Sequence, residues 1–147
     1  MSMENEQSPP SGRPRKKIAV VLRDDLENWQ IANVTAFLVS GLPSKDTDII
    51  GQEYQGADGV AYLPMFGQPV LVLGATADVL SAAHRRAVTR GMPLSVLTSD
   101  LFATGDDTDD RAAVRPVGTD ELDLVGIALH GGRNQVDKVV KGTVMYR

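Results

Sequence analysis

Short apolar runs, rich in β-branched residues, alternate along this chain with amphipathic segments of helical period. Such runs are typical of buried strands. The predicted strands are residues 17–22, 69–73, 94–97 and 122–129, with shorter ones at 48–54 and 143–146. The predicted helices are residues 28–40, 77–90 and 133–141, and a polar loop is expected from 99 to 120. Alternating strands and helices favour a three-layer α/β/α fold, in which helices cover both faces of one sheet.

Apolar side chains of the first two helices indicate the surface with which each would pack on the sheet. Thr76 is a suitable N-cap for the second helix, and Gly91 and Pro93 suit its end. The predicted apolar positions of the first helix are Ile31, Val34, Ala36, Phe37 and Leu38. Those of the second helix are Leu80, Ala83, Ala87 and Val88.

Length and composition indicate one cytoplasmic domain. The chain has 147 residues, of which 1–14 resemble a disordered lead-in and 15–147 are expected to form a single domain. There is no cysteine, which excludes disulfides and thiolate metal sites and fits a reducing compartment. A net charge of −4 makes nucleic acid an unfavourable partner. No apolar run approaches the length of a membrane span, and no nucleotide or zinc-protease motif is present, so we expect no membrane association, cofactor or metal.

The segment TSDLFATGDDTDD follows a predicted strand and carries the first candidate site. Open α/β sheets place ligands at the ends of strands, and here Asp100 and Thr104 are four residues apart. A carboxylate beside a hydroxyl orients and deprotonates water in hydrolases. The alternative is that both side chains cap their own loop. The run Asp106–Asp110 lacks calcium-loop spacing and is interpreted as a solvated turn.

Other candidate ligand contacts are His130, Arg133 and Trp29. His130 ends a predicted strand before Gly131-Gly132-Arg133, a turn at which a helix N-terminus binds an anion or at which the glycines serve only the turn. Trp29 starts the first helix, where it either packs on the core or lines a pocket. His84 lies within the second helix and is interpreted as a structural residue at the edge of the core.

Three longer segments resemble a bacterial family known only as a domain of unknown function, DUF2000, which is in turn similar to type II peptidyl-tRNA hydrolases. The segments are KIAVVLRDDLENWQIANVTAFLVSGL, HRRAVTRGMPLSVLTSDLFATG and DELDLVGIALHGGRNQVDKVVKG. The resemblance implies a compact α/β fold with a small mixed sheet, and a homodimer. The positions that match the hydrolase motifs are Arg23, Asp25 and Leu26, then Ile31-Ala32, then Asp100 and Thr104, and finally Val136-Asp137-Lys138-Val139.

The basic residues of the hydrolase motifs are replaced in this chain. The lysine before Ile-Ala is Gln30, the helix histidine aligns with Phe37, and the Gly-Arg between Asp and Thr is Phe102-Ala103. An enzyme acting on a tRNA ester uses such cations for binding and for the oxyanion. Peptidyl-tRNA hydrolysis is therefore only the third interpretation.

The first interpretation is an uncharacterised protein with hydrolase or acyl-transfer activity on a small ester or amide. Asp100 would activate water and Thr104 would position it. Gln30 would donate to the substrate carbonyl, while Trp29 or Phe102 shapes the pocket. The alternative is a non-catalytic module that binds a small molecule or a protein.

Overall fold

The computed structural model describes residues 15–104 and 106–146, so the predicted lead-in at 1–14 lies outside the described residues. A five-stranded sheet has the order β5-β6-β1-β4-β7. Its strands are β1 (Lys16–Arg23), β4 (Val70–Ala75), β5 (Leu94–Thr98), β6 (Leu124–Gly132) and β7 (Val144–Met145). The helices are α2 (Asn28–Ser40), α3 (Ala77–Thr89), α4 (Leu101–Thr104), α5 (Asp107–Val114) and α6 (Arg133–Val139). Three short 3₁₀ turns are η1 (Leu42–Ser44), η2 (Thr47–Ile49) and η3 (Thr119–Glu121).

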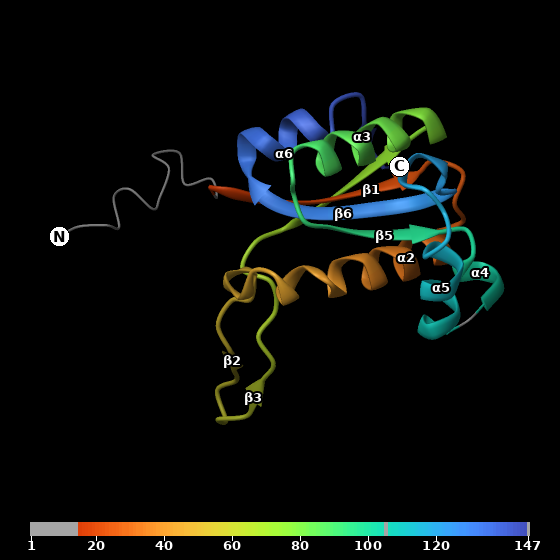
Figure 1. The fold of residues 1–147 in the computed structure, drawn as a ribbon. Coiled ribbons are helices and arrows are strands. Elements are labelled where there is room, and N and C mark those ends of the chain that lie inside the picture. Colours follow the sequence, from red (N-terminus) through yellow and green to blue (C-terminus); the bar gives the residue numbers. More distant parts are fainter. Residues whose placement is uncertain (1–14, 105, 147) are drawn as a thin grey trace.

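The sheet is mixed, and helices cover both of its faces. β1 pairs in parallel with β4 and antiparallel with β6, which in turn pairs antiparallel with β5. The strands β1, β4 and β5 therefore run in the same direction, and their carboxyl ends lie at the same end of the sheet. Figure 1 shows α3 and α6 on one face and α2 on the other, with α4 and α5 beside the first turns of α2. The predicted α/β architecture and its three layers are confirmed.

Two apolar cores lie on the two faces of the sheet because successive strand residues point to opposite sides. In β1, Ala19 and Val21 pack toward α3 and α6, whereas Val20 and Leu22 pack toward α2. The α2 contribution to the second core comes from Val34 and Leu38, which are one turn apart and almost fully buried. α2 is thus held by one narrow apolar stripe, and its other faces remain open.

Two of the predicted core faces are partly wrong. Leu80, Ala83 and Ala87 are buried as expected, but Val88 lies one position past this stripe and is 45% exposed. Phe37 is 54% exposed for the same reason, since only the Val34–Leu38 stripe of α2 meets the sheet. Ala36 is also exposed.

Two predicted elements differ from the structure. Residues 48–54, expected as a strand, contain the end of η2 and the first residue of β2 (Tyr54–Gln55), which forms a separate hairpin with β3 (Ala61–Tyr62). Residues 99–120, expected as a polar loop, contain α4, α5 and most of η3. The acidic run is therefore no turn, because Asp106 is the N-cap of α5 and its carboxylate accepts from the Asp109 N–H at 2.8 Å. The final strand lies at the sheet edge as predicted.

Across the described residues, every helix is too short or too polar to span a bilayer.

Candidate functional site

A cleft of about 790 Å³ opens at the carboxyl end of β5, between α2, α4 and α5. We call it the aromatic cleft. Its aromatic side chains are Trp29, Phe37 and Phe102, and its aliphatic side chains are Val96, Leu97, Leu101 and Val114. Its polar and charged side chains are Asn33, Thr98, Asp106, Asp107, Asp110, Arg111 and Arg115.

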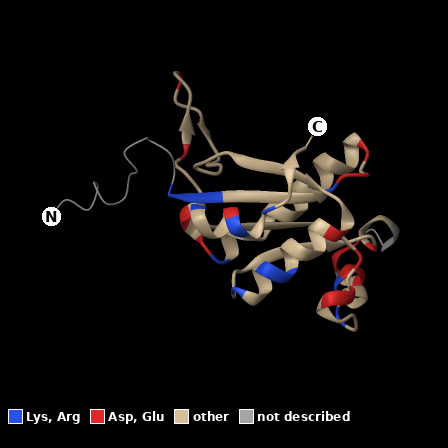
Figure 2. Cartoon of the chain, turned by 90° about the horizontal axis from the view of Figure 1, so that it is seen from above, with Lys and Arg blue, Asp and Glu red and all other residues tan. Residues whose placement is uncertain are grey.

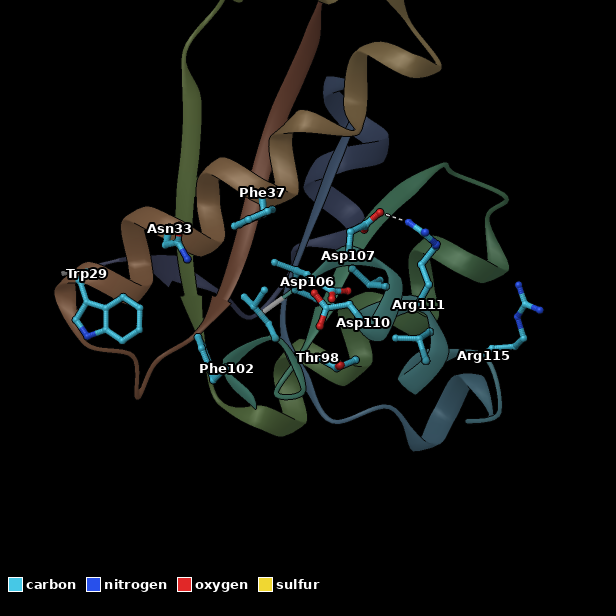
Figure 3. Close-up of a pocket in the computed structure, with 14 residues that line it drawn as sticks. Trp29, Asn33, Phe37, Thr98, Phe102, Asp106, Asp107, Asp110, Arg111 and Arg115 are labelled. Atoms are coloured by element: carbon cyan, nitrogen blue, oxygen red, sulfur yellow. Dashed lines mark hydrogen bonds and ion pairs between the residues drawn. The ribbon is translucent and has the colours of Figure 1, made fainter. Parts of the chain in front are cut away.

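One face of α2 forms the first wall of the aromatic cleft. Trp29, Asn33 and Phe37 are spaced four residues apart, so they lie above one another on the helix. Trp29 is 59% exposed, although its indole Nε1–H donates to Glu27 Oε1 at 3.2 Å. Its ring meets Phe102 edge to face, with centroids 6.3 Å apart and an interplanar angle of 72°. Phe102 is 39% exposed, so both rings keep surface open to solvent, and Figure 3 shows them at the same end of the cleft.

Backbone and side-chain hydrogen bonds set where α2 begins. Gln30 Oε1 accepts from the Glu27 N–H at 2.9 Å, which satisfies one of the donors that a helix start leaves unpaired. The Tyr146 hydroxyl donates to the Arg23 carbonyl at 3.1 Å and accepts from the Leu26 N–H at 3.3 Å. These contacts position Trp29. Gln30 itself is not among the described residues that line the aromatic cleft.

The floor of the aromatic cleft contains one buried hydroxyl next to a carboxylate. Thr98 is 5% exposed, and its Oγ1 donates to Asp100 Oδ2 at 2.9 Å. Ser99 Oγ donates to Asp123 Oδ2 at 2.5 Å, which ties this strand end to the segment before β6. Asp100 itself is not among the described lining residues. The side chain of Thr104 lies outside the described part of the structure.

The opposite wall is α5, on which acidic residues gather (Figure 2). Asp107 forms an ion pair with Arg111 one turn later. In Figure 3 the aromatic side chains lie at one end of the cleft, and Arg111 and Arg115 lie at the other. The cleft thus joins an apolar end to a charged end.

His130 and Arg133 lie at the other end of the sheet. His130 pairs with Ile18 across β1 and β6, far from the carboxyl end of β5. The Arg133 N–H donates to the Arg15 carbonyl at 3.1 Å. The structure therefore brings Trp29 and Phe102 together, joins Asp100 to Thr98 of the same cleft, and separates His130 and Arg133 from this group.

Several residues that line the aromatic cleft are not among the sequence predictions. Asn33 and Phe37 share the four-residue spacing of Trp29, and this spacing was a signal that could have placed all three on one helix face. Arg111 and Arg115 were missed because α5 was expected to be a loop. Among the described residues, no group of three or more His, Asp or Glu side chains is arranged to hold a metal ion.

Comparisons with known proteins place the chain beside others without a known activity. Residues 16–147 match the family model for proteins of unknown function DUF2000. A solved structure of a protein of unknown function from Agrobacterium tumefaciens strain C58 is 38% identical, covers 92% of this chain and 100% of its own, and has a TM-score of 0.87. The search of curated proteins gave no significant match.

Proposed function

Since this chain belongs to the DUF2000 family of proteins of unknown function, we propose from its own geometry that it binds a small amphipathic molecule in the aromatic cleft. The ligand has an aromatic or branched apolar end and a polar end. The observation that carries this proposal is the exposure of three aromatic rings around one cleft at a strand end.

Exposed rings at this position favour ligand binding over core packing. Trp29, Phe37 and Phe102 are 59%, 54% and 39% exposed, although all three are large apolar side chains. Contiguous apolar surface of this kind marks binding grooves on soluble proteins. The strand-end location is also where open α/β sheets bind their ligands.

Charged side chains at the far end of the aromatic cleft suit the polar end of the ligand. Arg111 already pairs with Asp107. Arg115 lines the same end, and no side chain among the described residues pairs with its guanidinium. A ligand with an anionic group would therefore gain a partner that the protein itself does not provide.

Trp29, the only tryptophan of the chain, gives a direct assay. We expect anilinonaphthalene sulfonate, an aromatic molecule with one anionic end, to quench Trp29 emission saturably with one site per chain. Phe102→Ala and Phe37→Ala are each expected to weaken binding by about fivefold, because each removes a ring worth about 1 kcal/mol. Leu63→Ala is the control, since Leu63 is 84% exposed on the hairpin away from the cleft. Equal affinity in all variants contradicts the proposal.

Hydrolysis of a small ester or amide is the second candidate. It is supported by the bond from Thr98 Oγ1 to Asp100 Oδ2 at the floor of the aromatic cleft and by the resemblance to type II peptidyl-tRNA hydrolases. Asp100 would accept the proton of an attacking water, and Thr104 would position that water. Gln30 caps the start of α2 and is not among the described residues that line the cleft, so the geometry gives no support to its predicted role as donor to the substrate carbonyl. The cleft would hold the apolar part of the substrate.

Nitrophenyl esters of graded chain length test this second candidate. Asp100→Asn is expected to lower kcat/KM by two orders of magnitude or more, in the usual range for loss of a general base. Thr104→Ala is expected to lower it less. An esterase activity that persists in both variants would remove hydrolysis at this site, and a bound ligand recovered unchanged would favour the binding function.

Peptidyl-tRNA hydrolysis and homodimerisation are further predictions from the resemblance. The acidic residues of α5 disfavour a tRNA backbone beside the cleft. A tRNA mobility shift that weakens with added salt would nevertheless support that substrate. Light scattering at several concentrations tests the homodimer.

A further inference from the structure

A second cavity, of about 680 Å³, lies where α2 ends, at the end of the sheet opposite the aromatic cleft. We call it the His130 pocket. It is lined by η1 and the turn after it, by the start of β5 and by the end of β6. These segments are distant in sequence and meet only through the fold.

Asp46 is the centre of the polar network in the His130 pocket. Its Oδ2 accepts from Lys16 Nζ at 3.0 Å and lies 3.2 Å from His130 Nδ1, while its Oδ1 accepts from the Asp48 N–H at 3.1 Å. The hydrogen bond from Lys16 is the main reason that the pKa of Asp46 is lowered. The carboxylate is therefore ionised and satisfied by protein donors.

His130 is held as a neutral imidazole with a defined tautomer. Its side chain is only 5% exposed, and burial lowers its pKa. Nδ1 faces the Asp46 carboxylate, so Nδ1 carries the hydrogen. Nε2 lies 3.4 Å from Gln68 Nε2 and accepts from that amide. This contact is long, so a ligand donor can replace it.

The charge of the His130 pocket is positive. Its charged lining residues are Lys16, Lys45 and Asp46. The Asp46 charge is matched by Lys16, whereas no side chain among the described residues pairs with the Lys45 ammonium. Basic residues likewise begin β1 at this end of the sheet, whereas acidic residues gather on α5 (Figure 2).

Apolar and hydroxyl groups complete the lining. Leu42, Pro93 and Leu94 form an apolar wall. The Ser95 hydroxyl faces the end of α2, where a Cβ on Gly41 would come within 2.7 Å of it. The absence of a side chain at Gly41 keeps this hydroxyl beside the cavity.

We propose that the His130 pocket is a second binding site that takes a small organic anion. Lys45 supplies the unpaired cation, and the Leu42, Pro93 and Leu94 wall takes the apolar part of the ligand. The neutral imidazole of His130, oriented by Asp46, supplies an acceptor for a ligand hydroxyl or N–H. This site is independent of the aromatic cleft and of its proposed ligand.

Nuclear magnetic resonance of the two histidines tests the site, because the chain has only His84 and His130. We expect hexanoate, titrated into the full chain, to shift the His130 imidazole signals saturably and to leave those of His84 in place. His84 is buried in α3, on the other face of the sheet. Acetate is expected to bind at least tenfold more weakly, because it lacks four CH₂ groups worth about 0.8 kcal/mol each when buried. Neutral hexanamide is expected to bind about fivefold more weakly than hexanoate.

Two lysine variants separate this site from a general salt effect. Lys45→Gln is expected to weaken hexanoate binding about fivefold, and Lys141→Gln, an exposed lysine after α6, to leave it unchanged. Equal shifts of both histidines, or hexanoate binding in Lys45→Gln at the wild-type affinity, would overturn the proposal. Trp29 emission recorded in the same titration reports the aromatic cleft separately, so failure of either site is distinguishable from failure of the other.

Discussion

The aromatic cleft and the His130 pocket lie at the two ends of α2, on the same face of one sheet, yet they are built differently. α2 has 13 residues, so its ends are about 18 Å apart. The aromatic cleft exposes rings and carries its charges on α5, a helix in which no residue is buried. In the His130 pocket, Lys16, Asp46 and His130 hold one another across three segments.

This difference indicates two ways of obtaining selectivity from one scaffold. Exposed rings select ligands by apolar area and shape, and their contacts depend little on pH. A network of fixed hydrogen bonds selects by charge and tautomer, and it responds to pH. A perturbation of the shared support should therefore affect both sites, whereas perturbations of pH, of the start of α2 and of the α5 charges should affect them unequally.

Gly126→Ala is expected to give the largest effect, because it disturbs the contact between α2 and the sheet, on which both sites depend. A Cβ at Gly126 would lie 2.8 Å from Leu22 Cδ2, 2.9 Å from Leu38 Cδ1 and 3.0 Å from the Val21 carbonyl oxygen. Overpacking of this kind costs about 1–3 kcal/mol of unfolding free energy. We expect urea denaturation to show this loss and both probes to bind more weakly.

Gly132→Ala is the matched control for Gly126→Ala. Gly132 is in the same strand, and a Cβ there would meet nothing within 4 Å. Equal stability of the two variants would mean that α2 adjusts without cost, and the two sites would then not share a rigid support.

The next effect concerns pH and separates the two sites. His130 has an ordinary pKa of 6.5, which burial lowers, so in the folded state the imidazole stays neutral where the unfolded chain takes up a proton. The free energy of unfolding should therefore fall as the pH falls below about 6.5. Asp46 adds nothing in this window, because its pKa is lowered from 3.8 and its contribution is lost only at more acid pH.

His130→Gln is expected to reduce the loss of stability measured between about pH 7 and about pH 5. The pKa of His84 is also lowered by burial, so His84→Gln is expected to remove the remaining part of this loss of stability. Anilinonaphthalene sulfonate affinity should change little over this range, since no histidine is among the described residues of the aromatic cleft. An unchanged pH profile in His130→Gln would show that folding does not lower the pKa of His130.

The sequence predicted the sheet and its three main helices because periodicity reports burial. β1 and α2 follow from an apolar run and from the Val34–Leu38 stripe, and the helix ends follow from Thr76 and from Gly91, which adopts a positive φ of 69°. α5 was missed because it buries no residue and so carries no apolar stripe. The hairpin was missed because strands of two residues contain too few positions for alternation.

The two sites were predictable only in part because they depend on tertiary contacts. Trp29 and Phe102 were proposed as pocket residues, but their edge-to-face contact joins segments more than 70 residues apart. His130 was proposed as a ligand contact at a turn, whereas its partners Asp46 and Gln68 come from the segment between α2 and β4. No local pattern around His130 indicates that carboxylate, because the pairing is set by the parallel crossover from β1 to β4.

Tyr146→Phe is expected to cost about 1 kcal/mol, because two hydrogen bonds to the β1–α2 connection are lost and part of the loss is compensated by water. The connection leads directly into Trp29, so probe affinity in the aromatic cleft should fall about twofold while hexanoate affinity at the His130 pocket stays constant. Tyr62→Phe, on the exposed hairpin, is the control. A larger change of affinity at the His130 pocket than at the aromatic cleft would contradict the claim that the two ends of α2 are independent.

Asp107→Asn is expected to have the smallest effect, at most about 0.5 kcal/mol, although it removes an ion pair at the aromatic cleft. Both side chains of the Asp107–Arg111 pair are largely exposed, so water and salt screen their attraction. Asp109→Asn loses the same favourable interaction with the start of α5 but no ion pair to Arg111, so the difference between the two variants isolates the pair. That difference should vanish when the ionic strength is raised. A difference that persists in high salt would mean that the rim of the aromatic cleft is as fixed as the His130 network, and the contrast between the two sites would be lost.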